Sequence, residues 1–140
     1  MQPLVMTRRI DAPVARVFAA WCDPAVIQRW FAPGDMHVPE ASADARPGGR
    51  YRIVMQAPDG KQHIVVGEYL DLQADRAIEF TWQWEGSEAI TRVRVDLRPV
   101  DAGSTELTLT HSGFATDEAR DNHEKGWIGC LAKLGPALAA

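Results

Sequence analysis

Cysteine is scarce in this 140-residue chain, which contains only Cys22 and Cys130. The two residues lie far apart and neither belongs to a CxxC pair, so a dense disulfide framework and a cysteine-based zinc site are excluded. Because free cysteine is usually buried, we expect two structural thiols in a reducing compartment, although the sequence leaves a single disulfide between them open.

Long apolar runs and blocks of positive charge are also absent. The N-terminal MQPLVMTRRIDAPV has no apolar core of signal-peptide length, and no later run approaches the roughly 20 residues of a membrane span. The net charge is −4, with acidic and basic residues interspersed, so the chain has no basic footprint for nucleic acid or for an anionic membrane. We expect a cytoplasmic protein with no membrane insertion and no nucleic-acid partner.

The chain does contain enough apolar residues for one core. Of its residues 46% are hydrophobic, and five of them are tryptophan. No repeat, low-complexity tract or linker divides the sequence, and a domain of this length buries roughly 68% of the surface of the unfolded chain. We therefore expect residues 1–140 to form a single domain.

The first 31 residues predict one strand followed by two short helices. The strand is LVMTRRI, residues 4–10, after which Asp11 is expected to cap a helix with Pro13 in its first turn. Asp23 and Pro24 repeat this pattern and start a second helix. The side chains expected to share one side of the second helix are Ile27, Trp30 and Phe31.

From about residue 36 onward the hydrophobic period falls to two, which predicts an antiparallel meander. Pro39 cannot donate to a strand ladder, so segment 36–44 is expected at a sheet edge. The remaining strands are predicted at 51–55, 63–72, 77–85, 91–97 and 105–111. Alternation places one set of side chains on a single apolar face, namely Tyr51, Ile53, Met55, Ile78, Phe80, Trp82, Trp84, Val93, Val95, Leu97, Leu107, Leu109 and His111.

A long helix near the C-terminus can cover that face. Thr116 is a suitable N-cap, and a helix over 117–134 would be about 27 Å long. Its apolar stripe consists of Trp127, Leu131, Leu134 and Leu138. These elements predict an α+β fold in which an antiparallel sheet packs against a C-terminal helix.

Six phrases in this order resemble the activator of heat-shock protein 90 ATPase homologue family, within the START-like (birch-pollen-allergen-like) superfamily. They are VFAAWCDPAVIQRWF, RPGGRYRIVMQAPDG, VVGEYLDL, AIEFTWQWE, TELTLTHSGF and HEKGWIGCLAKL, and together they extend over nearly the whole chain. The resemblance implies a helix-grip fold, in which a curved sheet wraps around the last helix. It also implies a pocket between the two.

The reactive motifs that the sequence suggests are incomplete. HEKGW resembles the zinc-binding HExxH, but Trp127 occupies the position of the second histidine, four residues after His123. His111 and Ser112 are adjacent and point to opposite strand faces, and Cys130 lies seven residues after His123, so neither makes a convincing catalytic pair. We expect no metal and no cofactor.

The candidate site residues are those expected to line a cavity between sheet and helix. They are Trp30, Phe31, Tyr51, Ile53, Glu68, Trp82, Trp84, Val93, His111, His123 and Trp127. Gly126 and Gly129 support a cavity, because a glycine inside a helix costs about 1 kcal/mol relative to alanine and needs a reason. That reason is either close packing or room for a ligand.

The sequence thus predicts a protein that binds a small apolar or amphipathic molecule, as a monomer or a homodimer. Two alternatives stay open. One is an enzyme in which His111 or His123 performs acid–base chemistry, of cyclase or hydrolase type, on a molecule in the same pocket. The other is a stress-response module that contacts a chaperone.

Overall fold

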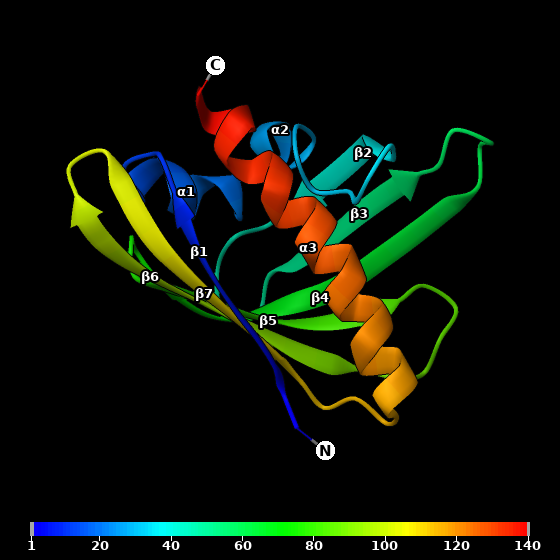
Figure 1. Ribbon diagram of the computed structural model, residues 1–140. Helices are drawn as coiled ribbons and strands as arrows, with labels where there is room; N and C mark the ends of the chain where they lie inside the picture. Colours follow the sequence, from blue (N-terminus) through cyan, green and yellow to red (C-terminus); the bar gives the residue numbers. More distant parts are fainter. Residues whose placement is uncertain (1, 140) are drawn as a thin grey trace.

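Seven antiparallel strands form one curved sheet around the C-terminal helix in the computed structural model, which describes residues 2–139 (Figure 1). The strand order is β1-β7-β6-β5-β4-β3-β2. The strands are β1 (Leu4–Ile10), β2 (His37–Ala43), β3 (Arg50–Gln56), β4 (Gln62–Gln73), β5 (Ala77–Trp84), β6 (Thr91–Asp101) and β7 (Ser104–Ser112). The helices are α1 (Val14–Ala20), α2 (Pro24–Ile27) and α3 (Asp117–Ala139). The predicted α+β helix-grip arrangement is confirmed.

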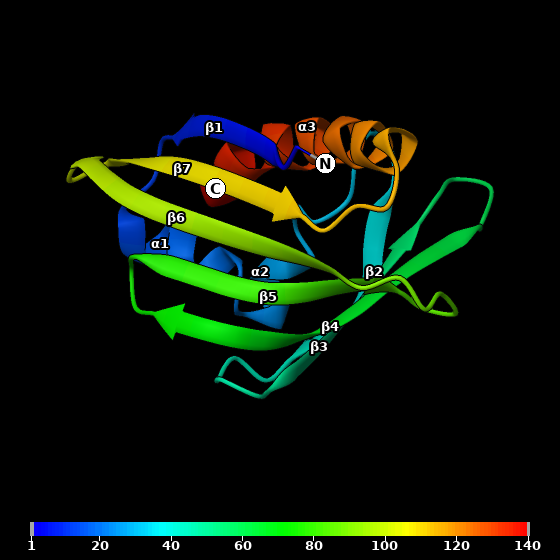
Figure 2. The same ribbon diagram turned by 90° about the horizontal axis from the view of Figure 1, so that it is seen from below.

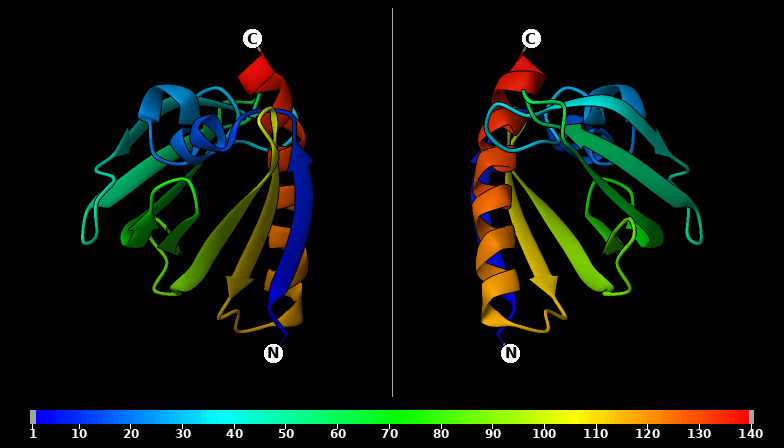
Figure 3. Two further views of the ribbon diagram at one scale, coloured as in Figure 1. Left: turned by 90° about the vertical axis from the view of Figure 1, so that its left-hand side faces the viewer. Right: turned by 90° about the vertical axis from the view of Figure 1, so that its right-hand side faces the viewer.

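The sheet bends so that its concave side receives all three helices. Viewed along the sheet, the strands fan outward from β1 and β7, which lie beside α3, while the short helices occupy one end of the concave side (Figures 2 and 3). The β2–β3 end lies farthest from the β1 edge. None of the helices within residues 2–139 combines the length and apolar character that crossing a membrane needs.

Alternation along the strands separates a buried face from a solvated one, as predicted. In β5, for example, Ile78, Phe80 and Trp82 are buried, whereas Glu79 and Thr81 between them are partly exposed. The outer face carries ion pairs, including Arg94 to Glu79 at 3.1 Å. A sheet with one apolar face must bury that face against other elements, and here α3, α1 and the segment after α2 supply them.

β2 lies at one edge of the sheet, where Pro39 predicted it. Its pairing with β3 shifts register between His37 and Glu40, around the proline that cannot donate a hydrogen bond. The other edge is β1, which pairs only with β7 in the strand order. Both ends of the sheet are therefore open edges rather than a closed barrel.

Asp11 does not cap α1, and this prediction was wrong. The residue before the helix is Pro13, and no side chain caps the first turn. Asp11 precedes that position by two residues, and its exposed carboxylate lies 3.8 Å from Arg9. A side chain caps a helix only from the position directly before the first turn, and the sequence places an aspartate and a proline too close together to say which one takes it.

Asp23 caps α2 as predicted, by accepting a hydrogen bond from the Ala25 amide at 3.0 Å. The helix is shorter than expected and ends at Ile27, so Trp30 and Phe31 lie beyond it rather than on it. Both are still buried, because a turn continues the chain toward the sheet. The Trp30 indole donates to the Ala20 carbonyl at 3.0 Å, which ties this turn to α1.

α3 begins where Thr116 predicted, with the threonine hydroxyl accepting from the Ala119 amide at 3.1 Å. It continues past Gly135 and Pro136 to Ala139, five residues beyond the predicted end. Proline removes one hydrogen bond from the helix interior, but the Arg29 guanidinium donates to the Ala137 carbonyl at 2.5 Å and supports this last turn. The extended α3 measures about 34 Å and spans the sheet.

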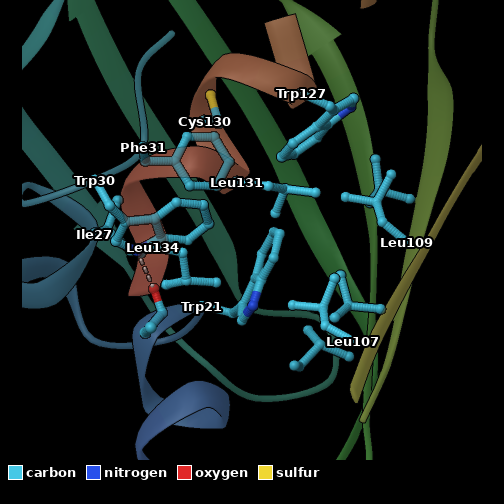
Figure 4. Packing of buried hydrophobic residues seen from close by; sticks show 14 of the residues in the cluster. Trp21, Ile27, Trp30, Phe31, Leu107, Leu109, Trp127, Cys130, Leu131 and Leu134 are labelled. Atoms are coloured by element: carbon cyan, nitrogen blue, oxygen red, sulfur yellow. Dashed lines mark hydrogen bonds between the residues drawn. The ribbon is translucent and has the colours of Figure 1, made fainter. Parts of the chain in front are cut away.

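The core lies between α1, α3 and the strands at the centre of the sheet. Figure 4 shows Trp21, from the end of α1, pointing into the same space as Trp127 and Leu131 of α3 and Leu107 and Leu109 of β7. The Trp21 and Trp127 ring centroids are 5.9 Å apart. This end of the concave side is filled by side chains, so any open space must lie elsewhere.

The two aspartates near the helix starts give a matched test of capping. Asp23→Ala should lower the free energy of unfolding by about 0.5–2 kcal/mol, because the Ala25 amide loses its acceptor. Asp11→Ala should leave it within about 0.5 kcal/mol of the parent, since this carboxylate is exposed. Urea titration of both variants measures the difference, and equal losses would contradict the assignment of the cap.

Candidate ligand-binding site

An open pocket of about 540 Å³ lies between the N-terminal half of α3 and the β3–β5 part of the sheet. Twelve described residues line it: Pro33, Met36, Met55, His63, Trp82, Trp84, Ala119, Asn122, His123, Gly126, Trp127 and Cys130. None of them is aspartate, glutamate, lysine or arginine. The size falls within the roughly 300–1,000 Å³ of small-molecule sites, and the apolar lining with a few polar groups is typical of them.

Helical spacing explains the α3 side of the pocket. Ala119, Asn122, His123, Gly126 and Cys130 recur at intervals of three or four residues and so share one face of the helix. Trp127 lies next to this face and is buried between helix and sheet. The stripe that follows it along α3 packs into the core instead.

The two helical glycines of this region have different surroundings. A methyl group at Gly126 would meet no other atom within 4 Å, so this glycine leaves space in the pocket. A methyl group at Gly129 would lie 3.0 Å from Pro33 Cβ and 3.1 Å from the Gly34 amide nitrogen. Gly129 therefore permits close packing of α3 on the segment before β2, while Gly126 keeps the pocket open.

His111 is fully buried behind the pocket and is held by two hydrogen bonds. The Trp127 indole donates to its Nδ1 at 3.1 Å, and its Nε2 lies 2.7 Å from the Thr91 hydroxyl. An indole N–H can only donate, so Nδ1 carries no proton and Nε2 donates to Thr91. The Thr91 hydroxyl in turn donates to the Trp82 carbonyl at 3.3 Å.

This environment keeps His111 neutral. Burial, and secondarily the neighbouring His123, lower its pKa from 6.5 to about 3. The ring centroids of the two histidines are 5.1 Å apart. His111 therefore has no free ring nitrogen and no readily accepted proton, which are the attributes of a packing residue with satisfied polar atoms.

His123 lies on α3 and accepts a hydrogen bond from an indole of the sheet, whereas His111 lies on the sheet and accepts one from an indole of α3. The Trp84 indole donates to the His123 Nε2 at 3.1 Å, and the His123 Nδ1 donates to the Ala119 carbonyl at 2.6 Å. One indole–imidazole hydrogen bond thus runs from α3 to β7 and the other from β5 to α3. Together they fasten the first half of α3 over the concave side of the sheet.

Four of the predicted site residues line the pocket: Trp82, Trp84, His123 and Trp127. Val93 and His111 are fully buried in the neighbouring strands. Glu68 lies on the other face of β4, since the buried positions of this strand are Val65, Gly67 and Tyr69. Its carboxylate is therefore not brought to the pocket.

Trp30, Phe31, Tyr51 and Ile53 pack at the filled end of the concave side. Phe31, Tyr51 and Ile53 border a space of only about 10 Å³, roughly the volume that one water molecule needs. The Phe31 ring lies 6.1 Å from Trp82 and 5.6 Å from Trp127, between this small space and the open pocket. These residues form core rather than an accessible site.

Several lining residues escaped the sequence reasoning. Met55 lies on the apolar strand face already recognised with Tyr51 and Ile53, and Asn122 and Cys130 lie four residues before and four residues after Gly126, on one face of the helix. Those patterns could have found them. Pro33 and Met36 carry no such signal, because only the path of the segment between α2 and β2 brings them against α3.

Neither thiol has the character of a nucleophile, and both are free. Burial raises the pKa of Cys130 to about 12 and that of Cys22 to about 11, so both are protonated at neutral pH. Within the described residues, no three histidine, cysteine, aspartate or glutamate side chains are grouped as metal ligands. The lining of the site therefore offers apolar surface and a few hydrogen-bonding groups.

The profile of the family "Activator of Hsp90 ATPase homolog 1-like protein" matches residues 11–139. No curated protein matches the chain at a significant level.

Many solved structures share the fold over nearly the full length. The AHSA1 protein from Silicibacter pomeroyi is 28% identical, with a TM-score of 0.87, and the match covers 99% of this chain and 98% of that one. A protein from Chromobacterium violaceum is 25% identical, with a TM-score of 0.88 and coverage of 99% and 97%. An AHSA1-like protein from Aeromonas hydrophila, 22% identical with a TM-score of 0.81 and coverage of 99% and 92%, shares the fold.

The buried neutral state of His111 predicts a pH-dependent stability. In the unfolded chain this histidine takes up a proton near pH 6.5, whereas in the folded chain it does so only near pH 3. Stability is therefore lost as the pH falls from about 6.5 toward 3, by up to about 1.4 kcal/mol per pH unit from this group. Urea titrations between pH 7 and 5 measure this slope.

His111→Gln provides the comparison, since glutamine can accept from Trp127 and donate to Thr91 but does not titrate. Its free energy of unfolding should fall less steeply with decreasing pH than that of the parent. Identical slopes would show that His111 is not the group responsible.

Proposed function

The chain belongs to the family of activator of Hsp90 ATPase homolog 1-like proteins, and we propose that it binds a small apolar or amphipathic molecule between its sheet and α3. The observation that carries the proposal is the open pocket of about 540 Å³ with an uncharged, largely apolar lining. Protein interiors are normally packed so closely that few spaces larger than a water molecule remain. Here Gly126 leaves the pocket open, at a cost to helix stability.

The proposed ligand is held mainly by burial of its apolar surface. The deep wall is formed by Met55, Trp82 and Trp127, all buried, and the mouth by the exposed His63 and Asn122. Burial of apolar area contributes roughly 25 cal/mol per Å² and gives little orientation, which the polar groups at the mouth would add. Binding in this form requires neither a metal nor a cofactor.

The contacts of His111 and His123 disfavour acid–base catalysis by either of these two side chains. Each imidazole already makes hydrogen bonds with protein groups at both ring nitrogens. A general base needs a nitrogen within reach of the substrate proton, directly or through one water. Turnover would therefore require at least one of these bonds to break.

A pocket-filling substitution tests the proposal directly. Gly126→Leu should fold normally, because its Cβ meets no other atom within 4 Å and leucine favours a helix, but its side chain would occupy the pocket. The affinity for the neutral fluorophore N-phenyl-1-naphthylamine should fall by about tenfold or more. Fluorescence titration measures the affinity, and mass spectrometry of the purified parent identifies any retained molecule.

Gly135→Leu is the matched control. Gly135 lies in the same helix, and its Cβ also meets no other atom within 4 Å, but it does not line the pocket. This variant should bind the fluorophore like the parent. Parent-like binding by Gly126→Leu as well would contradict the proposed site.

The family description supplies a second candidate function, a contact with the chaperone Hsp90. Its test is the ATPase rate of Hsp90 with the parent and with Gly126→Leu. If this function is independent of the pocket, both proteins should stimulate the ATPase equally. No stimulation by either protein would remove this candidate.

A further inference from the structure

The pocket has no charged side chain to neutralise a charged ligand. Its twelve lining residues contain no carboxylate, ammonium or guanidinium group. The nearby cation of Lys133 lies outside the lining, and its Nζ donates to the Met36 carbonyl at 3.1 Å. A carboxylate or an ammonium drawn into the apolar depth would lose its hydration without gaining a counterion, which is strongly unfavourable.

Three indole rings, inclined to one another, form an aromatic wall of the pocket. The Trp82 ring centroid lies 5.5 Å from that of Trp84, at an interplanar angle of 82°, and 5.1 Å from that of Trp127, at 48°. Such inclined rings offer both faces and edges to a planar molecule. Aromatic pairs gain energy beyond area burial in stacked and edge-to-face arrangements, whereas an alkyl chain gains from burial alone.

Sulfur-containing residues from three separate segments line the pocket, namely Met36, Met55 and Cys130. Met55 and Cys130 are buried, so their positions are fixed by packing. Sulfur makes favourable contacts with aromatic rings, often at the ring edge. This lining therefore favours an aromatic occupant for a second, independent reason.

The exposed polar side chains of the lining lie at the mouth, while in the deep wall the buried Trp82 indole N–H has no hydrogen-bond partner among the described residues. Asn122 and His63 are exposed, while both nitrogens of His123 are already engaged. A ligand that carries one hydrogen-bonding group would place it beside Asn122 and His63, in contact with water. Its apolar remainder would then enter the aromatic depth.

From these features we infer that the ligand is an uncharged aromatic molecule with one hydrogen-bonding group, rather than a fatty acid or a simple alkyl chain. The inference rests on the proposed function, since it specifies the chemistry of the molecule that fills this pocket. It predicts a preference in both charge and shape. These two preferences can be measured separately.

Four small probes separate charge from shape: 2-naphthol, 2-naphthoate, decan-1-ol and decanoate, each titrated at pH 7 by isothermal titration calorimetry. We expect 2-naphthol to bind about tenfold more tightly than 2-naphthoate, because only the latter is charged, and about tenfold more tightly than decan-1-ol, because only the naphthol is aromatic. Decanoate should bind most weakly.

Two variants test the source of the preference. Trp84→Leu should lower the ratio of the 2-naphthol affinity to the decan-1-ol affinity by about threefold or more, because it removes an aromatic face and keeps an apolar one. Met55→Leu keeps the volume and removes a sulfur, and should shift the same ratio in the same direction. Thermal melting shows whether each variant is folded. If one variant does not fold, the other alone tests the source of the preference.

The outcomes distinguish the inference from the proposed function. Suppose that decan-1-ol, decanoate or 2-naphthoate binds as tightly as 2-naphthol, or more tightly, and that Gly126→Leu abolishes this binding. This result would overturn the inference of an uncharged aromatic ligand, but the pocket would remain the binding site. If neither the four probes nor N-phenyl-1-naphthylamine bind with a Kd below about 1 mM, the proposed function itself fails.

Discussion

The structure depends on one geometric constraint, which is that a single helix must cover the apolar face of a sheet much wider than itself. Seven strands at about 4.8 Å spacing span about 29 Å, whereas a helix with its side chains is about 10–12 Å across. Curvature of the sheet brings the strands around α3 and reduces the part of the apolar face that the helix leaves uncovered. The short α1 and α2 and the aromatic residues that follow them fill one end of the remaining space. At the other end no second helix within residues 2–139 packs beside α3, and the pocket lies there, between α3 and the β3–β5 part of the sheet.

The fastening of α3 follows from the chemistry of tryptophan and histidine. Because an indole can only donate, each tryptophan dictates which imidazole nitrogen is free of a proton, and so orients the ring. Trp127 does this to His111 across the helix–sheet junction, and Trp84 does it to His123 in the reverse direction. The helix and the sheet each contribute one indole N–H and one imidazole nitrogen to these two bonds, so four polar groups are hydrogen-bonded without any charge. Three of these residues, Trp84, His123 and Trp127, also line the pocket, so its shape and the attachment of the helix are determined together.

Sequence periodicity was sufficient for most of the fold and insufficient for the site. The strand faces were predictable because alternation is a local property of the chain, and Thr116 and Asp23 were predictable because capping residues have strong preferences. Asp11 failed because the start of a helix cannot be located to one residue when a proline follows closely. The phase of β4 was ambiguous, since apolar residues occupy both of its faces.

Tertiary contacts resolve what periodicity left open. Tyr51 lies opposite Gly67 in the ladder, and a methyl group there would be only 2.6 Å from the tyrosine ring, so Gly67 must face inward and Glu68 outward. The pocket arises in the same way, from Met36 and Met55 meeting α3 across long sequence separations. Such contacts depend on the three-dimensional path of the chain, which no local pattern contains.

The pairing of β1 with β7 also constrains how the chain can fold. Leu4 is the ladder partner of His111, so the first strand has no neighbour in the sheet until β7 has been synthesised. Closing so long a loop is entropically costly and slows folding, because contacts distant in sequence bring no gain before closure. During synthesis the chain emerges from its N-terminus, and α3 follows all seven strands in the sequence. The concave apolar face is therefore protected from solvent and from other nascent chains only after every strand has been made.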